Sequence, residues 1–194
     1  MLHTPLARHG LTLAMLPKHA RVDEMEFVFP VDALLTPRAL ERVFRAHKAP
    51  SAWPSYASEL RQLGFEALHG YLRGFIDLVF RHQGRFYIVD YKSNWLGPSE
   101  SDYGPSALAR ALSDHHYYLQ YHLYTVAVHR YLAQRVRGYD YDSHFGGVYY
   151  LFLRGMAPTH EAQTGVFFDR PPRALVEALD GMLKPAPGAS EVTL

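Results

Sequence analysis

The sequence contains no cysteine, and this absence excludes disulfide bonds and metal sites built on thiolates. It also lacks any apolar run long enough to cross a bilayer, and residues 1–16 lack the continuous apolar segment of a secretion signal. These absences predict a soluble, unexported protein of a reducing cytoplasm. Twelve histidines remain as possible metal ligands, together with the carboxylates.

A strong charge of one sign is missing too. Lysine and arginine number 20 and aspartate and glutamate 19, which gives a net charge of +1. The isoelectric point is near 8.0, below the value of about 9 that is typical of strongly basic nucleic-acid-binding domains. Any contact with DNA must therefore be local. The 194 residues, 48% of them hydrophobic, predict one domain with a well-buried core.

Two aspartates and a lysine interrupt apolar, aromatic-rich segments. Asp77 lies in the segment 74–80, and Asp90 and Lys92 lie in 86–92. Both segments have strand-like composition, and the Gly-containing separator 82–84 predicts a hairpin turn. Asp and Lys are depleted from strands. Because strand side chains alternate between faces, Asp90 and Lys92 are expected to project to the same side.

A divalent cation would offset the cost of placing these charges in a sheet. Burying an unpartnered carboxylate costs several kcal/mol in effective terms. Mg²⁺ prefers oxygen ligands and retains waters that a substrate phosphate can replace. Only four of the 20 basic residues are lysines, so Lys92 indicates a need for a compact ammonium. The alternative is a structural Asp–Lys pair without chemistry.

Hydrophobic periodicity and turn residues outline the other elements. Residues 116–136 form the strongest predicted helix, and Thr36 and Pro37 cap a helix that ends near His47. No internal repeat or low-complexity block is present. The remaining expectations are strands at 24–30, 65–80 and 148–153, helices from 105 and over 171–183, and irregular segments at 49–58, 97–104 and 139–147.

Three long segments carry a resemblance to a known family. They are GFIDLVFRHQGRFYIVDYKSNWLG (74–97), LQYHLYTVAVHRYL (119–132) and YDYDSHFGGVYYLFLRG (139–155). The second contains Gln120 and Tyr124, four residues apart on one helical face. Together they resemble the PD-(D/E)xK nuclease superfamily, in its RecB-like branch with a Q-x-x-x-Y helix. The resemblance extends over residues 24–182.

The resemblance implies an α/β, restriction-endonuclease-like fold in which helices flank a central mixed β-sheet. The nuclease domain is then expected over residues 23–183. The sequence predicts no role for segment 1–22, and residues 184–194 are expected to form a flexible C-terminal tail.

The family's chemistry is carried over to matching positions. Asp77 and Asp90 are implied to bind one or two Mg²⁺ ions, for which Mn²⁺ or Ca²⁺ can substitute. The main-chain carbonyl of Tyr91 is implied as a further ligand, and Lys92 as the catalytic lysine. Glu24 falls where the family places an upstream acid. Glu26, two residues later, is the other candidate for that role.

Further residues are candidates for contact with DNA. Gln120 and Tyr124 are implied to contact DNA or to orient the active-site groups, although a polar stripe on a packed helix is the alternative. Trp95 follows the catalytic strand and either stacks on a base or caps the core. Arg73 beside the hairpin either contacts a phosphate or is simply solvated.

The implied function is metal-dependent hydrolysis of DNA, of the exodeoxyribonuclease V type, in double-strand-break repair and recombination. Single strands would be delivered by a helicase motor. The implied partners are DNA, the helicase portion of the same parent subunit, RecC-like and RecD-like subunits and RecA. No membrane is involved.

One departure supports an alternative function. The family also carries a metal-binding histidine in a G-x-x-x-H context before the first core strand. His3, His9 and His19 lack that spacing, which predicts an excised fragment or a truncated reading frame that begins after this helix. An incomplete ligand shell binds a hard cation less well. The alternative is a catalytically incomplete, nuclease-like module that tethers DNA or docks RecC-like or RecA partners.

Overall fold

The computed structural model describes residues 2–6, 10–31, 35–47, 56–64, 70–157 and 164–184. Contacts divide the chain into two compact units. The first unit comprises Met1–Met25 and Phe75–Arg170, and the second comprises Glu26–Gly74 and Pro171–Leu194. All residues of the predicted Asp–Asp–Lys cluster belong to the first unit, so its geometry is described within one compact body.

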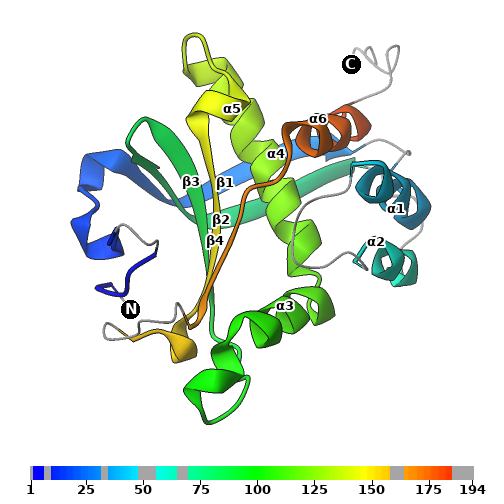
Figure 1. Ribbon diagram of the computed structural model, residues 1–194. Helices are drawn as coiled ribbons and strands as arrows, with labels where there is room; N and C mark the ends of the chain where they lie inside the picture. The colour runs from blue at the N-terminus through cyan, green and yellow to red at the C-terminus, as the bar shows by residue number, and fades with distance from the viewer. Residues whose placement is uncertain are drawn as a thin grey trace. The chain divides into compact units, whose positions relative to one another are not determined.

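The strands form one mixed five-stranded sheet in the order β1-β2-β3-β4-β5 (Figure 1). Their bounds are Arg21–Val31, Gly70–His82, Arg85–Lys92, Phe145–Phe152 and Val166–Asp169. β2 and β3 pair antiparallel, β3 and β4 parallel, and β4 and β5 antiparallel. The mixed sheet flanked by helices confirms the α/β expectation. The short strand β5 was not predicted.

A tight turn connects β2 and β3. His82 pairs with Arg85, and Gln83 and Gly84 lie between them with φ angles of 48° and 80°. Positive φ at both central residues is characteristic of the type I′ turn, whose twist matches that of a hairpin. Glycine adopts this conformation without steric cost. The predicted hairpin is therefore confirmed, and its turn fixes the register of the two strands.

The N-terminal segment covers one face of the sheet in the first unit. It contains two short 3-10 helices, η1 (Leu13–Met15) and η2 (Lys18–Ala20). Its leucines are buried against side chains of β2, β3 and β4 in one cluster, which includes Leu6, Leu11, Leu13, Leu16, Leu78, Phe80, Val89, Tyr149 and Leu151. The sequence revealed no role for this segment because these leucines follow no regular period.

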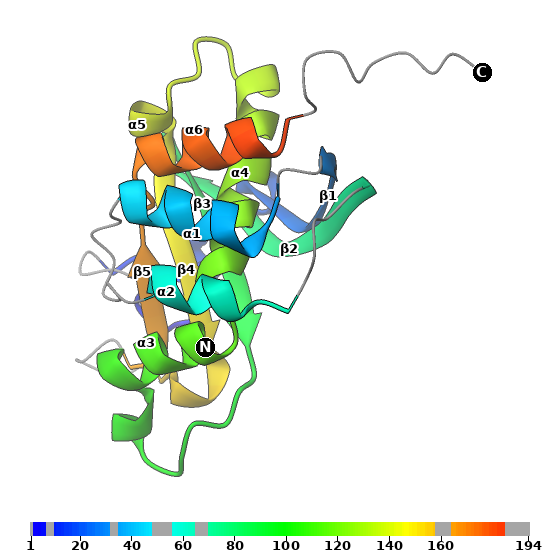
Figure 2. The same cartoon turned by 90° about the vertical axis from the view of Figure 1, so that its right-hand side faces the viewer.

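Helix α4 (Tyr117–Arg135) runs next to β4 in both views (Figures 1 and 2) and contacts that strand. The rings of Tyr121 on α4 and Tyr150 on β4 meet edge to face, with centroids 5.8 Å apart. α4 also contacts α3 (Pro105–Asp114). Among the helices of the described residues, none combines the length and apolar character needed to cross a bilayer.

In the second unit, α1 (Pro37–Ala46) contacts α2 (Tyr56–Glu59), η3 (Leu60–Gln62) and α6 (Arg173–Met182). Figure 2 shows α6, α1 and α2 in succession. As predicted, Thr36 caps α1: its hydroxyl accepts the amide hydrogen of Ala39 at 3.2 Å. Leu40 and Phe44 are the buried apolar residues of this helix.

Two segments expected to be irregular contain short helices. Within 97–104 lies η4 (Glu100–Tyr103), which begins with a capping box formed by Ser99 and Asp102. Within 139–147 lies α5 (Tyr141–His144). A further 3-10 helix, η5 (Leu153–Gly155), follows β4. Residues 48–55, 65–69 and 185–194 lie outside the described residues, so the expectations for most of the 49–58 loop, for the start of the 65–80 strand and for all but the first residue of the tail stay untested.

Candidate active site

The hairpin places two carboxylates on one face of the sheet. Leu78 pairs with Val89 and Val79 with Ile88, so continuing this antiparallel register by one step sets Asp77 opposite Asp90. Directly opposed residues of an antiparallel pair project to the same face. The charge of Asp77 also raises the pKa of Asp90, as expected of carboxylates within electrostatic reach. The shared face is confirmed. A shared metal ion stays a prediction.

Asp90 and Lys92 form a buried ion pair. The Lys92 Nζ lies 2.7 Å from the Asp90 Oδ2, and the two residues are only 9% and 4% exposed. Burial raises the pKa of Asp90 above its ordinary value, while the hydrogen bond and the charge of Lys92 oppose that rise. The two side chains therefore lie on the same side of β3, as the strand alternation predicted.

Asp77 is oriented by the neighbouring strand. Its Oδ2 accepts a hydrogen bond from the main-chain amide of Tyr91 at 2.8 Å. A backbone donor is fixed in space, so it holds the carboxylate in one orientation. Asp77 is half-buried, in contrast to the fully buried Asp90. One carboxylate of the pair is thus more accessible to solvent than the other.

The Lys92 ammonium lies in a cage contributed by two further elements. It donates to the Gln120 Oε1 at 2.9 Å and lies 3.8 Å from the ring centroid of Tyr117, both on α4. The ring of Tyr150 on β4 is 4.9 Å away. Aromatic faces attract a cation through their quadrupole. Carboxylate, amide oxygen and rings together restrict the ammonium to one position.

Gln120 links this cage to two tyrosines. The Tyr150 hydroxyl donates to the Gln120 Oε1 at 2.9 Å, and the Gln120 Nε2 donates to the Tyr124 hydroxyl at 3.0 Å. Burial, followed by the negative charges of Asp90 and Asp77, raises the pKa of Tyr124 to about 12. Of the alternatives left open for Gln120 and Tyr124, this arrangement favours orientation of the active-site groups.

The sequence did not single out Tyr117 or Tyr150. The parallel register sets Tyr150 beside Asp90. A tyrosine within a nearly continuous apolar strand was the available signal, because a buried phenol needs a polar partner. Tyr117 also donates through its hydroxyl to the Asn94 Oδ1 at 3.2 Å. This bond ties the start of α4 to the segment after β3.

Trp95 lies just beyond β3 and is 66% exposed. It borders a cavity of about 260 Å³ that is also lined by Gly97, Pro98, Ser99, Glu100, Tyr103 and Arg154. The Arg154 Nε donates to the main-chain carbonyl of Ser93 at 3.0 Å. The indole ring is therefore accessible to solvent.

Glu24, Glu26 and Arg73 are the remaining candidates. Glu24 on β1 is exposed and adopts a left-handed conformation with φ of 54°, which interrupts regular strand alternation. In the second unit, the Arg73 Nε binds the Glu26 Oε1 at 2.5 Å. These contacts test neither the role expected of Glu24 nor the role expected of Arg73. Among the described residues, no group of three or more His, Asp or Glu side chains forms a ready metal site.

Comparison with known proteins places this chain in a family. The family described as "PD-(D/E)XK nuclease superfamily" matches residues 11–189. The chain is 44% identical over 182 residues to RecBCD enzyme subunit RecB of Escherichia coli (strain K12), covering 94% of this chain and 15% of that protein. RecB of Haemophilus influenzae is also 44% identical over 182 residues, which cover 93% of this chain and 14% of that protein.

A more distant relative is RecB of Mycolicibacterium smegmatis, which is 39% identical over 201 residues. That alignment covers 92% of this chain and 18% of the relative. The chain therefore spans less than a fifth of the length of these three proteins. With the family match extending over nearly the whole sequence, and with two aspartates and a lysine on one face of a hairpin in a mixed sheet, the chain belongs to the PD-(D/E)XK nuclease superfamily.

Proposed function

We propose that the protein is a metal-dependent deoxyribonuclease that hydrolyses phosphodiester bonds in single-stranded DNA. The observation that carries this proposal is the caged Lys92, ion-paired with Asp90 on the face that also carries Asp77. We assign it to exodeoxyribonuclease V type chemistry in the cytoplasm, during DNA repair and recombination. Relatives named as RecBCD subunits support this assignment.

Asp77 and Asp90 would hold Mg²⁺, and the Tyr91 carbonyl would be a further ligand. Two carboxylates supply the hard oxygen donors that Mg²⁺ prefers while leaving positions for water and a phosphate. The fit has a physical basis here, because burial and the charge of Asp77 both raise the pKa of Asp90, and a cation would relieve both effects. When bound, the ion would supply a water of lowered pKa and neutralise phosphate charge.

Lys92 would act on the charge that develops during hydrolysis. Its ammonium is already fixed by Asp90 and Gln120, so it requires little reorganisation before the transition state. Preorganised charge of this kind stabilises a transition state more effectively than mobile charge. Gln120, together with Tyr117 and Tyr150, would hold the ammonium in place and not touch the reacting atoms.

Other residues would hold the DNA strand. Trp95 offers an exposed ring on which a base can stack, and base–aromatic stacking contributes about 1–3 kcal/mol per base. Arg73 would bind a phosphate after exchanging its partner Glu26. Tyr124, bound to Gln120, would border the substrate. Glu24 would be the upstream acid, with Glu26 as the second choice for that role.

The proposed setting is a larger assembly. A helicase portion of the same subunit would deliver single strands, and RecC-like and RecD-like subunits and RecA would be its protein partners. The similarity to proteins named RecB supports this setting, since those relatives extend far beyond the region that the chain matches.

A second candidate function is a nuclease-like module without catalysis, used to tether DNA or to dock a RecC-like subunit or RecA. Two observations favour it. The described residues contain no group of three or more His, Asp or Glu side chains able to hold a metal. In addition, Lys92 occupies one oxygen of Asp90, where a metal would otherwise bind.

Cleavage of an end-labelled single-stranded oligonucleotide separates the two functions. The nuclease proposal expects products with Mg²⁺, none with EDTA, and none from the Asp90→Ala variant with Mg²⁺. Asp114→Ala removes an exposed carboxylate on α3 and serves as the matched control. Binding of the oligonucleotide without any metal-dependent cleavage would favour the module that only tethers DNA.

A further inference from the structure

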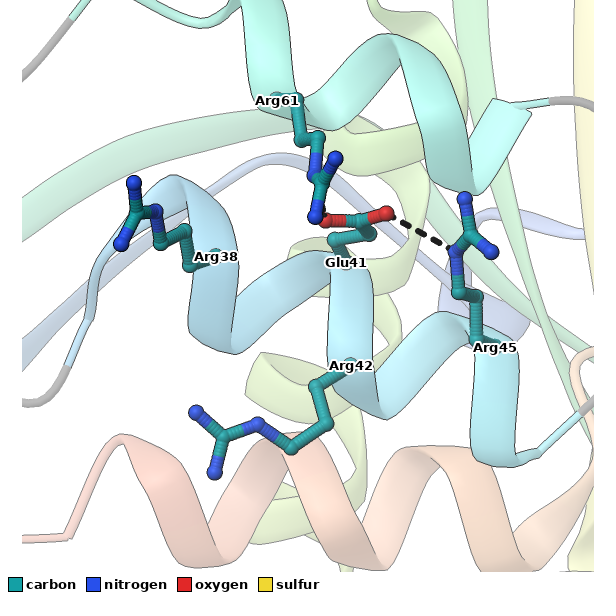
Figure 3. A pocket seen from close by; sticks show the side chains of 5 residues that line it. All are labelled: Arg38, Glu41, Arg42, Arg45 and Arg61. Carbon is teal, nitrogen blue, oxygen red and sulfur yellow. Dashed lines mark hydrogen bonds and ion pairs between the residues drawn. The ribbon is translucent and has the colours of Figure 1, made fainter.

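A cavity of about 420 Å³ in the second unit is lined by charged side chains (Figure 3). Its described lining consists of Arg38, Glu41, Arg42 and Arg45 from α1 and Arg61 from η3, and we call it the arginine pocket. Four guanidinium groups and one carboxylate leave a formal charge of +3. This concentration is notable in a chain whose net charge is only +1.

The pocket has an ordered framework. α1 contacts η3, which brings Arg61 to the helix. Glu41 is only 5% exposed and lies between two of the arginines, as Figure 3 shows. It accepts a hydrogen bond from Arg61 and forms an ion pair with the Arg45 Nε at 2.8 Å. Arg45 also donates to the Ser58 hydroxyl at 3.1 Å. Two guanidinium groups are therefore held in place.

The other two arginines are exposed and are not held by Glu41. Arg38 and Arg42 are four residues apart, so they lie on one face of α1, and in Figure 3 both side chains extend away from Glu41. Within the described part of the chain, neither forms an ion pair. Arg38 is in the first turn of α1, which contains no acidic residue. The positive helix end disfavours a cation there and favours an anion.

We infer that the arginine pocket binds the phosphodiester backbone of a DNA strand, a contact separate from the Asp77–Asp90–Lys92 cluster. Guanidinium forks match the oxygens of a phosphate, and backbone contacts need charge but no apolar surface. All described lining side chains of the pocket are charged, as an anionic ligand requires. Arginine clusters also bind acidic peptides. The chain's membership in a nuclease superfamily favours the nucleic-acid backbone, and the acidic peptide is an outcome of the test.

This inference rests on the proposed function only in taking DNA as the ligand. Arg38 and Arg42 would provide the donors that meet phosphate oxygens first. Arg45 and Arg61, whose charge Glu41 partly offsets, would set the position of the strand. The pocket would hold DNA in a manner that does not depend on sequence, because phosphates carry no base information.

The double variant Arg38→Gln/Arg42→Gln tests the inference on the full chain. Its matched control is Arg110→Gln/Arg137→Gln, which removes the same charge from exposed positions outside the pocket. The probe is a fluorescein-labelled oligodeoxythymidylate, and its fluorescence anisotropy is measured in EDTA so that cleavage does not contribute. Circular dichroism melts verify that both variants fold.

The pocket variant should bind the oligonucleotide about tenfold more weakly than wild type, because it loses two exposed charge contacts and each contributes about threefold to affinity. The slope of log K against log salt should fall by about 1.4, because each phosphate contact on a single strand contributes about 0.7. The control should retain wild-type affinity. Absence of Mg²⁺-dependent cleavage by wild type, with the anisotropy difference between wild type and the pocket variant still present, would count against the nuclease function and not against the pocket.

Three outcomes would overturn the inference. The first is an equal loss in both variants, which would indicate a nonspecific effect of net charge. The second is no measurable binding of the oligonucleotide by wild type at low salt. The third is loss of labelled polyglutamate binding in the pocket variant while its DNA binding is unchanged, which would make the ligand an acidic peptide.

Discussion

At Lys92, one ammonium group contacts a carboxylate, an amide oxygen and two aromatic rings. The contact with Asp90 is 2.7 Å long and that with Gln120 is 2.9 Å. A planar guanidinium is larger and bonds through a rigid fork, so an arginine would not fit the same set of partners. The sequence's choice of a rare lysine at this position thus has a geometric explanation.

Replacing Lys92 by Gln keeps much of the side chain's length but removes its charge. Stabilisation by metal should persist in Lys92→Gln, because the proposed ligands remain and a competing cation has gone. The rate of cleavage of single-stranded DNA should fall about 10²–10³-fold, the usual contribution of a group that stabilises developing charge. Single-turnover kinetics at saturating metal measures this effect.

Asp90→Ala provides the comparison, since it should lose both the metal response and cleavage. Cleavage by Lys92→Gln at the wild-type rate would show that Lys92 is only a structural partner of Asp90.

The sequence predicted part of this cluster for a local reason. The common face of Asp77, Asp90 and Lys92 follows from strand alternation and from a turn that closes between nearby residues. The positions of Tyr117 and Tyr150 depend on the parallel register of β3 and β4 and on the packing of α4. No local pattern encodes that register, because more than 50 residues separate the two strands.

At the scale of elements, nine of the 19 residues of α4 are buried. Its buried residues include Tyr118, Tyr121, His122, Thr125 and Val128. The sequence predicted α4 and the capped helix α1 well, because length and capping residues are strong signals. The four residues of β5 escaped prediction since so short a strand depends on its partner β4 for pairing.

His122 on α4 makes folding stability depend on pH. Burial lowers its pKa from 6.5 to about 4, although its bond to the Tyr118 carbonyl, 2.6 Å long, opposes the shift. The unfolded chain therefore binds a proton between pH 6.5 and 4 that the folded chain does not. The stability associated with neutral His122 is complete above pH 6.5 and is lost as pH falls towards 4, by about 2 kcal/mol at pH 5.

Urea unfolding at pH 7.5 and pH 5 measures this dependence. Between these two pH values, the free energy of unfolding of His122→Gln should fall by about 2 kcal/mol less than that of wild type. Burial raises the pKa of Asp169, so this residue changes the pH dependence of stability in the direction opposite to His122. Its contribution is present in both proteins and cancels when they are compared. Equal pH sensitivity of the two proteins would contradict the assignment to His122.

At the scale of the whole molecule, family membership and the α/β class were accessible from the sequence, whereas the packing of the N-terminal segment was not. Its irregularly spaced leucines gain meaning only when the face formed by Leu78, Val89 and Leu151 is present to receive them. The position of a segment without hydrophobic periodicity depends on its tertiary contacts, and a single sequence does not reveal those contacts.

Metal binding should stabilise the entire fold. A ligand that binds only the folded state adds RT ln(1 + [L]/Kd), or about 2.7 kcal/mol at a hundredfold excess over Kd. Mg²⁺ or Mn²⁺ should therefore raise the melting temperature measured by differential scanning calorimetry. The rise should disappear in Asp90→Ala and persist in the exposed control Asp114→Ala. Equal shifts in all three proteins would place the ions elsewhere.

The two-residue turn at Gln83 and Gly84 has a consequence for the order of folding. A short hairpin closes within about 1–10 µs, whereas pairing β3 with β4 first requires closure of a loop of more than 50 residues. Asp77 and Asp90 are therefore expected to face each other early. The aromatic cage of Lys92 forms only when the chain between β3 and β4 has folded back. During folding, the carboxylate pair thus exists for a time without the contacts that later fix its lysine.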